Sequence, residues 1–351
     1  MNLKKILEKN AVRASVPCRV DLGGTLDIST FYLPLHHLSP ASFNIALDLR
    51  TRVSLFPWEK GYVKVESKGF ETAVFRNDEA PFNHPMGLMF SIANYFNAHG
   101  VHIKIESTSP PRSALGGSSS AAVAMISAFH EALDKNINPE QIAWLAHYIE
   151  SSVAGVPCGM QDQLAAAFGG VNQWVWKMGE THPAFERIPI FKNKADIKAF
   201  NSNILIAYCG IPHVSKDINN QWVKSFVRGE TRSVFEKIIG LTKEFSTAVE
   251  HMNFRQAAKL MNQETKLRIK MTPDVLDKAG KKMFEKAMNC NCGARFTGAG
   301  GGGCLWAIGE TADIQNLKFF WQEILESVEN AKILDTKIED KGIVIMVNGE
   351  L

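Results

Sequence analysis

The sequence contains no apolar run that approaches the roughly eighteen residues of a membrane-spanning helix. Its first ten residues are charged and amphipathic, and they lack the apolar core of a secretory signal. Neither sign of charge dominates, since 39 Lys and Arg oppose 36 Asp and Glu, and the basic residues are scattered along the chain. These absences predict a cytoplasmic protein with no membrane partner and no dedicated nucleic-acid surface.

Paired cysteines are also missing. The chain has 6 cysteines among 351 residues, dispersed through apolar or glycine-rich segments. Cys290 and Cys292 lie close together but have no second Cys or His pair at the spacing of a zinc site. We therefore expect reduced thiols rather than a disulfide framework or a structural metal centre.

The chain does have a loop rich in Gly and Ser between a predicted strand and a predicted helix. Apolar and polar residues alternate over 101–106, which indicates a half-buried strand, and helix-forming residues fill 121–133. The loop contains Gly116, Gly117 and the serines at 118–120. A phosphate could approach this backbone and bind the unpaired N–H groups at the positive end of the helix dipole. A helix cap is the alternative interpretation, because serines often cap helices and the loop lacks the Gly-Lys-Ser/Thr ending of a P-loop.

A second candidate lies near the amino terminus, where Arg19 stands inside an apolar strand predicted over 11–22. Asp21 and Asp27 lie on either side of a turn that contains two glycines. A buried guanidinium is costly unless it pairs with a carboxylate or a phosphate. Arg19 therefore either forms a salt bridge within the protein or binds an anionic ligand.

Two further acids follow the Gly/Ser loop. Glu150 lies near the end of a helix predicted over 139–152, and Asp162 comes after a turn that contains glycines at 155 and 159. Asp162 also begins an Ala-rich segment, where capping of a helix is the simplest role for an Asp. A carboxylate among apolar neighbours could instead be oriented as a catalytic group.

The sequence pattern changes near Thr181, and we place a domain boundary there, between residues 1–180 and 181–351. The second part begins with a buried strand over 204–208 and continues with helical segments. It then reaches a five-glycine cluster at 298–303. Glycine this dense costs chain entropy, so it indicates either close approach of the backbone to another group or a tight hairpin.

These segments, in this order and at these distances, resemble the GHMP kinases, the family of galactokinase, homoserine kinase, mevalonate kinase and phosphomevalonate kinase. The resemblance covers almost the whole chain and rests on three motifs together. They are a Pro-rich lead into the Gly/Ser loop at 110–122, the acid Asp162 after a glycine turn, and Gly-Ala-Gly-Gly-Gly-Gly at 298–303. The sugar kinases fit best, because 155–172 is similar to galactokinase, fucokinase and the bacterial heptose-phosphate kinases.

The resemblance implies a role for each candidate residue. Asp162 would be the catalytic aspartate, with Arg19 as the cation beside it. Ser118 and Glu150 would hold Mg²⁺, with Ser119 as the rival of Ser118. The acceptor would contact Asp27, Gly159, Asp162 and Tyr208. ATP would bind along Pro111, Ser113, Leu115, Gly116, Gly117, Ser118, Ser119, Ser120, Gly300 and Gly301.

The neighbouring Arg19 suggests how Asp162 would behave. A guanidinium close to a carboxylate stabilises the ionised form, so we expect Arg19 to lower the pKa of Asp162. That effect would favour an orienting role for Asp162 over a role as proton acceptor, and both roles stay open.

The implied function is ATP-dependent transfer of a γ-phosphoryl group to a hydroxyl of a sugar or sugar phosphate, at the anomeric position. The alternatives are a mevalonate-type isoprenoid kinase and a catalytically inactive binding protein of the same fold. The implied fold is α/β (α+β) with two domains, the first like domain 2 of ribosomal protein S5 and the second ferredoxin-like. The implied partners are the small-molecule substrate and at most a second copy of the chain, as a monomer or homodimer.

Overall fold

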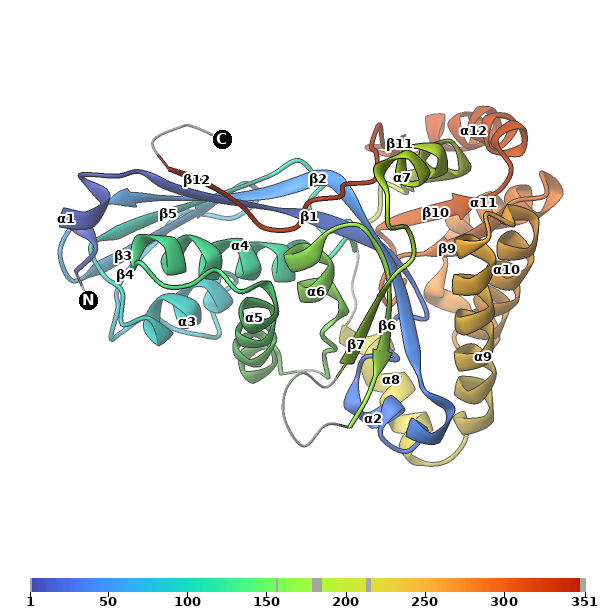
Figure 1. Cartoon of the computed structure of the whole chain (residues 1–351), viewed down its shortest axis with the longest axis horizontal. Coiled ribbons are helices and arrows are strands. Elements are labelled where there is room, and N and C mark those ends of the chain that lie inside the picture. The colour runs from blue at the N-terminus through green and yellow to red at the C-terminus, as the bar shows by residue number, and fades with distance from the viewer. Residues whose placement is uncertain (1, 156, 179–184, 213–215, 348–351) are drawn as a thin grey trace.

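The computed structural model describes residues 2–155, 157–178, 185–212 and 216–347. Two β-sheets organise these residues, one at each end of an elongated molecule (Figure 1). The first sheet has the order β12-β1-β2-β5-β3-β4, with β6 pairing with β2 and β7 pairing with β6. The second sheet has the order β11-β8-β10-β9.

The first sheet is built around two long antiparallel strands, β1 (Val12–Leu22) and β2 (Ala41–Pro57). Residues 14–22 of β1 are all buried, because helices pack on one face while residues of the second sheet contact Asp21. Its other strands are β3 (Tyr62–Ser67), β4 (Ala73–Arg76), β5 (Val101–Ser107), β6 (Val171–Trp176), β7 (Phe185–Pro189) and β12 (Val344–Val347).

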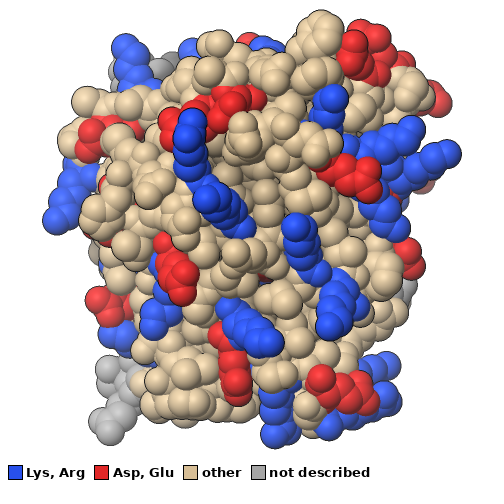
Figure 2. Space-filling view, turned by 90° about the vertical axis from the view of Figure 1, so that its right-hand side faces the viewer, with Lys and Arg blue, Asp and Glu red and all other residues tan. Residues whose placement is uncertain are grey.

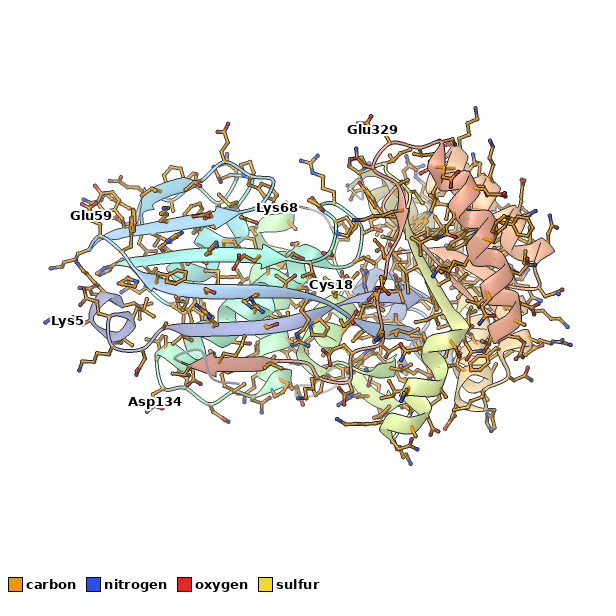
Figure 3. The ribbon with its side chains drawn as sticks, turned by 90° about the horizontal axis from the view of Figure 1, so that it is seen from above. Lys5, Cys18, Glu59, Lys68, Asp134 and Glu329 are labelled. Atoms are coloured by element: carbon orange, nitrogen blue, oxygen red, sulfur yellow. The ribbon has the colours of Figure 1, made fainter. Side chains whose placement is uncertain are left out.

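Four helices cover one face of the first sheet (Figure 1), and Figure 3 shows the sheet from its other side, with the strands in front. Residues 119–129 of the central helix are all buried, as expected for a helix composed of small and apolar residues on every side. The four helices are α3 (Gly87–Tyr95), α4 (Gly117–Ala132), α5 (Pro139–Ala154) and α6 (Gln161–Phe168).

The second sheet follows the ferredoxin-like pattern. Along the chain its strands are β8 (Ile204–Tyr208), β9 (Gly293–Phe296), β10 (Cys304–Ile308) and β11 (Lys332–Ile333). In space the first strand lies between the fourth and the third, which is the split β-α-β arrangement. The predicted α/β (α+β) class is therefore confirmed.

Helices α8 to α12 lie between β8 and β11 along the chain. They are α8 (Lys216–Val227), α9 (Arg232–Glu250), α10 (Phe254–Met271), α11 (Lys278–Asn289) and α12 (Thr311–Glu326). Short helices α1 (Lys4–Leu7), α2 (Ser29–Tyr32) and α7 (Lys194–Phe200) complete the α-helices among the described residues, which also include the 3-10 helices η1 (His36–Leu38), η2 (Asn201–Asn203) and η3 (Pro273–Val275). Acidic and basic side chains are interspersed on the face shown in Figure 2. No helix in the described ranges combines the length and apolarity needed to cross a bilayer.

The predicted boundary near Thr181 lies outside the described residues. Strands from both sides of it share the first sheet, because β7 pairs with β6 and β12 pairs with β1. The division into 1–180 and 181–351 therefore stays a prediction.

Candidate active site

The Gly/Ser loop enters α4 without a side-chain cap. Its N-cap residue Gly116 has a left-handed φ of +75°, and no described side chain caps the first turn. A Cβ added to Gly117 would meet no atom within 4 Å, so the space beside this turn is open. The backbone N–H groups there lack intrahelical acceptors and lie at the positive end of a 16-residue helix. No serine of the loop caps this helix as its N-cap residue, and the geometry of the open first turn suits an anion, whose binding here stays a prediction.

Glu150, on α5, faces this helix start. Its Oε1 accepts a hydrogen bond from Ser118 Oγ at 2.5 Å, and its Oε2 accepts from Ser119 Oγ at 2.8 Å and from Gln163 Nε2 at 2.7 Å. Burial raises the pKa of Glu150, and the hydrogen bonds from the two serines oppose that rise. Both candidate serines thus meet the same carboxylate, but Ser118 is exposed and Ser119 is buried.

Arg19 and Asp162 form a bidentate ion pair. Arg19 Nε donates to Asp162 Oδ1 at 2.8 Å, and Nη2 donates to Oδ2 at 2.7 Å. The remaining nitrogen, Nη1, donates to the carbonyl oxygen of Ala114 at 2.7 Å, so one guanidinium holds both the acid and the loop. Gly116 permits this approach, because a Cβ there would lie 3.2 Å from Asp162 Oδ2. Cys18, which precedes Arg19, is labelled in Figure 3 where the first sheet approaches the second.

The pKa of Asp162 does not follow the prediction. Burial raises this pKa above its ordinary value of 3.8, and the charge of Arg19 opposes the rise without cancelling it. The nearby charge of Asp21 adds to the increase. The predicted net lowering is therefore wrong, because the cost of removing the carboxylate from water outweighs the attraction of one guanidinium. A raised pKa makes Asp162 a better proton acceptor than an exposed aspartate.

Asp27 lies beside the start of α6. Its Oδ2 accepts the N–H of Gln161 at 3.0 Å. Gly159 packs directly on this carboxylate, since a Cβ on Gly159 would lie 1.7 Å from the same oxygen. Burial raises the pKa of Asp27 to about 6, and the charges of Asp162 and Asp21 add to the effect. The structure therefore brings Asp27, Gly159 and Asp162 into one region.

Cys158 belongs to the same region. Burial raises the pKa of its thiol to about 12, with further contributions from Glu150, Asp27 and Asp162. This partly buried thiol is therefore neutral and lies within the field of three carboxylates. The sequence predicts a reduced thiol at this position.

Several other residues predicted to contact the nucleotide form hydrogen bonds to groups of the protein itself. The carbonyl oxygens of Ser113 and Leu115 accept the N–H groups of Cys304 at 2.9 Å and Arg19 at 3.1 Å. Ser120 Oγ donates to Gly116 O at 2.8 Å. Pro111 is exposed.

The late glycine cluster approaches the protein's own backbone and side chains. The N–H groups of Gly300 and Gly301 donate to Thr297 O at 3.3 Å and to Val275 O at 3.0 Å. Their contact with a nucleotide stays a prediction. Tyr208 is buried at the end of β8 opposite Cys304, and no described hydrogen bond joins it to Asp27 or Asp162.

A buried ionic network beside the turn that precedes Asp27 was not predicted from the sequence. It consists of Asp21, Glu264, Arg268 and Arg295, whose ion-paired side chains are 0% exposed. A signal was available, because Glu264 and Arg268 are spaced i, i+4 on the buried side of α10.

The chain is similar in sequence and in fold to known kinases. A family model described as the GHMP kinases N terminal domain matches residues 83–170, which include Glu150 and Asp162. A mevalonate kinase from Thermococcus onnurineus is 28% identical over 327 residues, covering 85% of this chain and 89% of the relative. A D-glycero-alpha-D-manno-heptose 7-phosphate kinase from Campylobacter jejuni is 29% identical over 170 residues, covering 46% of this chain and 49% of the relative. The structure of Lactococcus lactis galactokinase complexed with galactose matches with a TM-score of 0.74 at 17% identity, covering 95% of each chain.

Residues 83–170 are thus similar to the amino-terminal domain of the GHMP kinases, and kinases of this kind match most of the chain in sequence. Its two-domain fold is the fold of the GHMP kinase structures that it matches. The similar enzymes include both mevalonate kinases and kinases of sugars or sugar phosphates, so the similarity indicates a kinase but does not identify the acceptor.

Proposed function

We propose that this protein is an ATP-dependent kinase that transfers the γ-phosphoryl group to a hydroxyl of a sugar or sugar phosphate. The observation that carries the proposal is the Arg19–Asp162 ion pair beside the open start of α4. Phosphoryl transfer requires mainly an in-line hydroxyl and positive groups around the transferred oxygens. We further propose that the protein acts in the cytoplasm as a monomer or homodimer.

The distribution of buried charge supports this proposal. Arg19, Arg268 and Arg295 each contact a carboxylate of the protein. Glu150 and Asp27, by contrast, receive only hydroxyl or amide donors in the described contacts. Asp27 is buried and Glu150 partly buried, and carboxylates removed from water without a cation indicate positions that a ligand completes.

Ser118 and Glu150 fit a magnesium ion. Both offer oxygen atoms, which are the ligands that Mg²⁺ prefers, and Mg²⁺ commonly takes its other ligands from water and nucleotide phosphates. The described residues hold no cluster of three or more His, Cys, Asp or Glu side chains that would build a metal site from protein alone. We assign the metal contact to Ser118 rather than Ser119 because Ser118 is the exposed one. When bound, Mg²⁺ would supply positive charge beside the phosphates.

The protein residues then have separate tasks. The N–H groups of the first turn of α4 hold the phosphate chain, and Arg19 adds positive charge while it fixes Asp162 in place. Arg19 occupies one lone pair on each oxygen of Asp162, which leaves the others for the acceptor hydroxyl. As the new O–P bond forms, the hydroxyl proton passes to Asp162, and ADP leaves. Asp27 accepts hydrogen bonds from neighbouring hydroxyls of the acceptor.

The charges around Asp27 favour a neutral, hydroxyl-rich group over a carboxylate. The groups whose charge most affects its pKa are Asp162 and Asp21, both acidic. An anionic mevalonate beside these acids would be repelled, whereas sugar hydroxyls would donate to Asp27. The second candidate remains a mevalonate-type kinase, which is favoured by the 28% identity to the Thermococcus enzyme over most of both chains.

A coupled assay of ADP release tests the proposal directly. It uses ATP and Mg²⁺ with galactose, fucose, arabinose, glucuronate, mannose, a heptose 7-phosphate and mevalonate. We expect turnover with a sugar or sugar phosphate and none with mevalonate. Turnover with mevalonate alone would overturn the sugar assignment, and nucleotide binding without ADP release on any acceptor would favour an inactive binding protein.

A further inference from the structure

The buried ionic network joins the two halves of the molecule behind the candidate acceptor site. Glu264 Oε1 accepts from Arg268 Nε at 2.9 Å, and its Oε2 accepts from Arg295 Nε at 2.9 Å. Arg295 Nη1 then donates to Asp21 Oδ2 at 3.2 Å. Two arginines and two acids thus balance in charge, and none of these four side chains is exposed.

Arg268 reaches from this network to the turn formed by residues 23–27, which we name the acceptor turn because it ends at Asp27. Its Nη2 donates to Gly24 O at 2.7 Å, and its Nη1 donates to Thr25 Oγ1 at 3.2 Å. The guanidinium also lies 4.6 Å from the centre of the Trp222 ring. The guanidinium is planar and lies over the Trp222 ring, so it can donate to Gly24 O and Thr25 Oγ1 together in only one orientation.

The acceptor turn has a conformation that needs such support. Thr25 has a φ of +75°, which is unfavourable for a β-branched residue. Gly24 leaves no space for a side chain, because a Cβ would lie 2.1 Å from Asp21 Oδ2. The strained turn therefore depends on contacts from outside its own sequence.

The other end of the network reaches the late glycine cluster. Asp21 Oδ1 accepts the N–H of Gly298 at 2.7 Å, and Asp21 O accepts Trp306 Nε1 at 3.0 Å. The same cluster leads into Cys304, whose N–H donates to Ser113 O in the Gly/Ser loop at 2.9 Å. The network is thus continuous with both the acceptor turn and the loop at the start of α4.

An ionic network in this position is costly if it serves only packing. Each buried charge loses its hydration, and apolar side chains of similar volume often pack as well. What apolar residues cannot do is donate hydrogen bonds in fixed directions to Gly24 O and Thr25 Oγ1. We propose that Arg268 is a positioning residue, which holds the acceptor turn so that Asp27 is set for binding of the phosphoryl acceptor. The kinetic part of this inference rests on the proposed function, but the structural part does not.

Hydrogen exchange of the folded protein tests the structural part without any substrate. In Arg268→Lys, we expect amide exchange within 23–27 to accelerate about tenfold, as for loss of a charge-assisted hydrogen bond. Exchange in β5 and α4 should keep its wild-type rate. Arg50→Lys is the matched control, because Arg50 also donates several hydrogen bonds, to Ser15, Glu339 and the backbone near β12, and should leave the acceptor turn unchanged.

A second variant keeps the inference testable if Arg268→Lys fails to fold. Thr25→Gly removes the Oγ1 acceptor and relieves the strained φ without altering any buried charge. We expect exchange within 23–27 to rise about threefold, less than in Arg268→Lys, because Thr25 Oγ1 accepts only one of the two hydrogen bonds that Arg268 donates to the turn. Unchanged exchange at the turn in both folded variants, or equal acceleration throughout the chain, would overturn the inference.

Kinetics supply the functional readout once the coupled assay has found an acceptor. Arg268→Lys should raise KM for the acceptor about tenfold while KM for ATP changes less than about twofold. Equal effects on both KM values would show a merely structural role and contradict the inference. If no acceptor is turned over, the proposed function fails while the exchange result still decides the role of Arg268 at the turn.

Discussion

At the scale of single residues, the carboxylates of the candidate active site differ in whether a basic side chain pairs with them. Arg19 pairs with Asp162, whereas Asp27 and Glu150 have no basic partner in the described contacts. The residue types and their spacing indicated these four positions from sequence. The net direction of the Asp162 pKa could not be predicted, since it depends on burial that only the folded structure reveals.

Asp162 gives the first prediction. Asp162→Asn removes the proton acceptor but keeps the shape of the side chain, so kcat should fall by about 10² to 10⁴. Nucleotide affinity should stay within about threefold of wild type. The comparison variant is Asp134→Asn, which alters an exposed acid at a distance from the site (Figure 3). Near wild-type turnover of Asp162→Asn would remove this residue from the mechanism.

Asp27 gives a prediction about pH. Its pKa in the folded protein is about 6, above the ordinary 3.8. Protonation therefore favours the folded state, and this contribution is complete below about pH 4 and is lost as pH rises through 6. An asparagine side chain cannot ionise, so the Asp27→Asn variant does not lose this stability as the pH rises. At pH 7.5 its free energy of unfolding should therefore exceed that of wild type by about 2 to 3 kcal/mol.

Urea titrations at pH 4, 6 and 7.5 measure this difference, with Asp335→Asn as the exposed control. The gain should shrink toward zero at pH 4. A stability difference that does not vary with pH would mean that Asp27 does not titrate in this range. The same substitution should weaken binding of the acceptor, because a carboxamide accepts hydrogen bonds from hydroxyls less strongly than a carboxylate.

At the scale of elements, the start of α4 carries the candidate nucleotide site. The sequence predicted the strand over 101–106 and a helix over 121–133, but α4 begins earlier, at Gly117. Serines disfavour a helix interior, so propensity alone placed them in the loop, whereas the structure turns Ser118 and Ser119 toward Glu150 and includes them in the first turn. This geometry depends on a contact between separate helices, which periodicity does not report.

Gly117 tests the electrostatics of this element. Gly117→Asp places a negative charge in the first turn, where it should stabilise the helix by about 0.3 to 1 kcal/mol. The same charge should repel the triphosphate and weaken ATP binding at least about tenfold. Gly117→Asn, which has the same size without the charge, should retain most of the affinity. Calorimetric titration with ATP measures the affinity of both variants. Equal affinities of the two variants for ATP would mean that the nucleotide binds away from this turn.

At the scale of the whole molecule, the two sheets meet through contacts between distant parts of the chain. The fold class and the ferredoxin-like second sheet followed from recognisable motifs and from the resemblance they carry. The buried ionic network did not, because Arg268 and Gly24 are separated by 244 positions and no local pattern connects them. Strands β7 and β12 likewise join the first sheet from beyond the predicted boundary.

The most direct test is a crystal structure with a non-hydrolysable ATP analogue and Mg²⁺. We expect the phosphates to lie over the first turn of α4, with the metal at Ser118 and Glu150 and the terminal phosphate facing Asp162. A triphosphate bound elsewhere, or an Asp162 carboxylate turned away from it, would contradict the account.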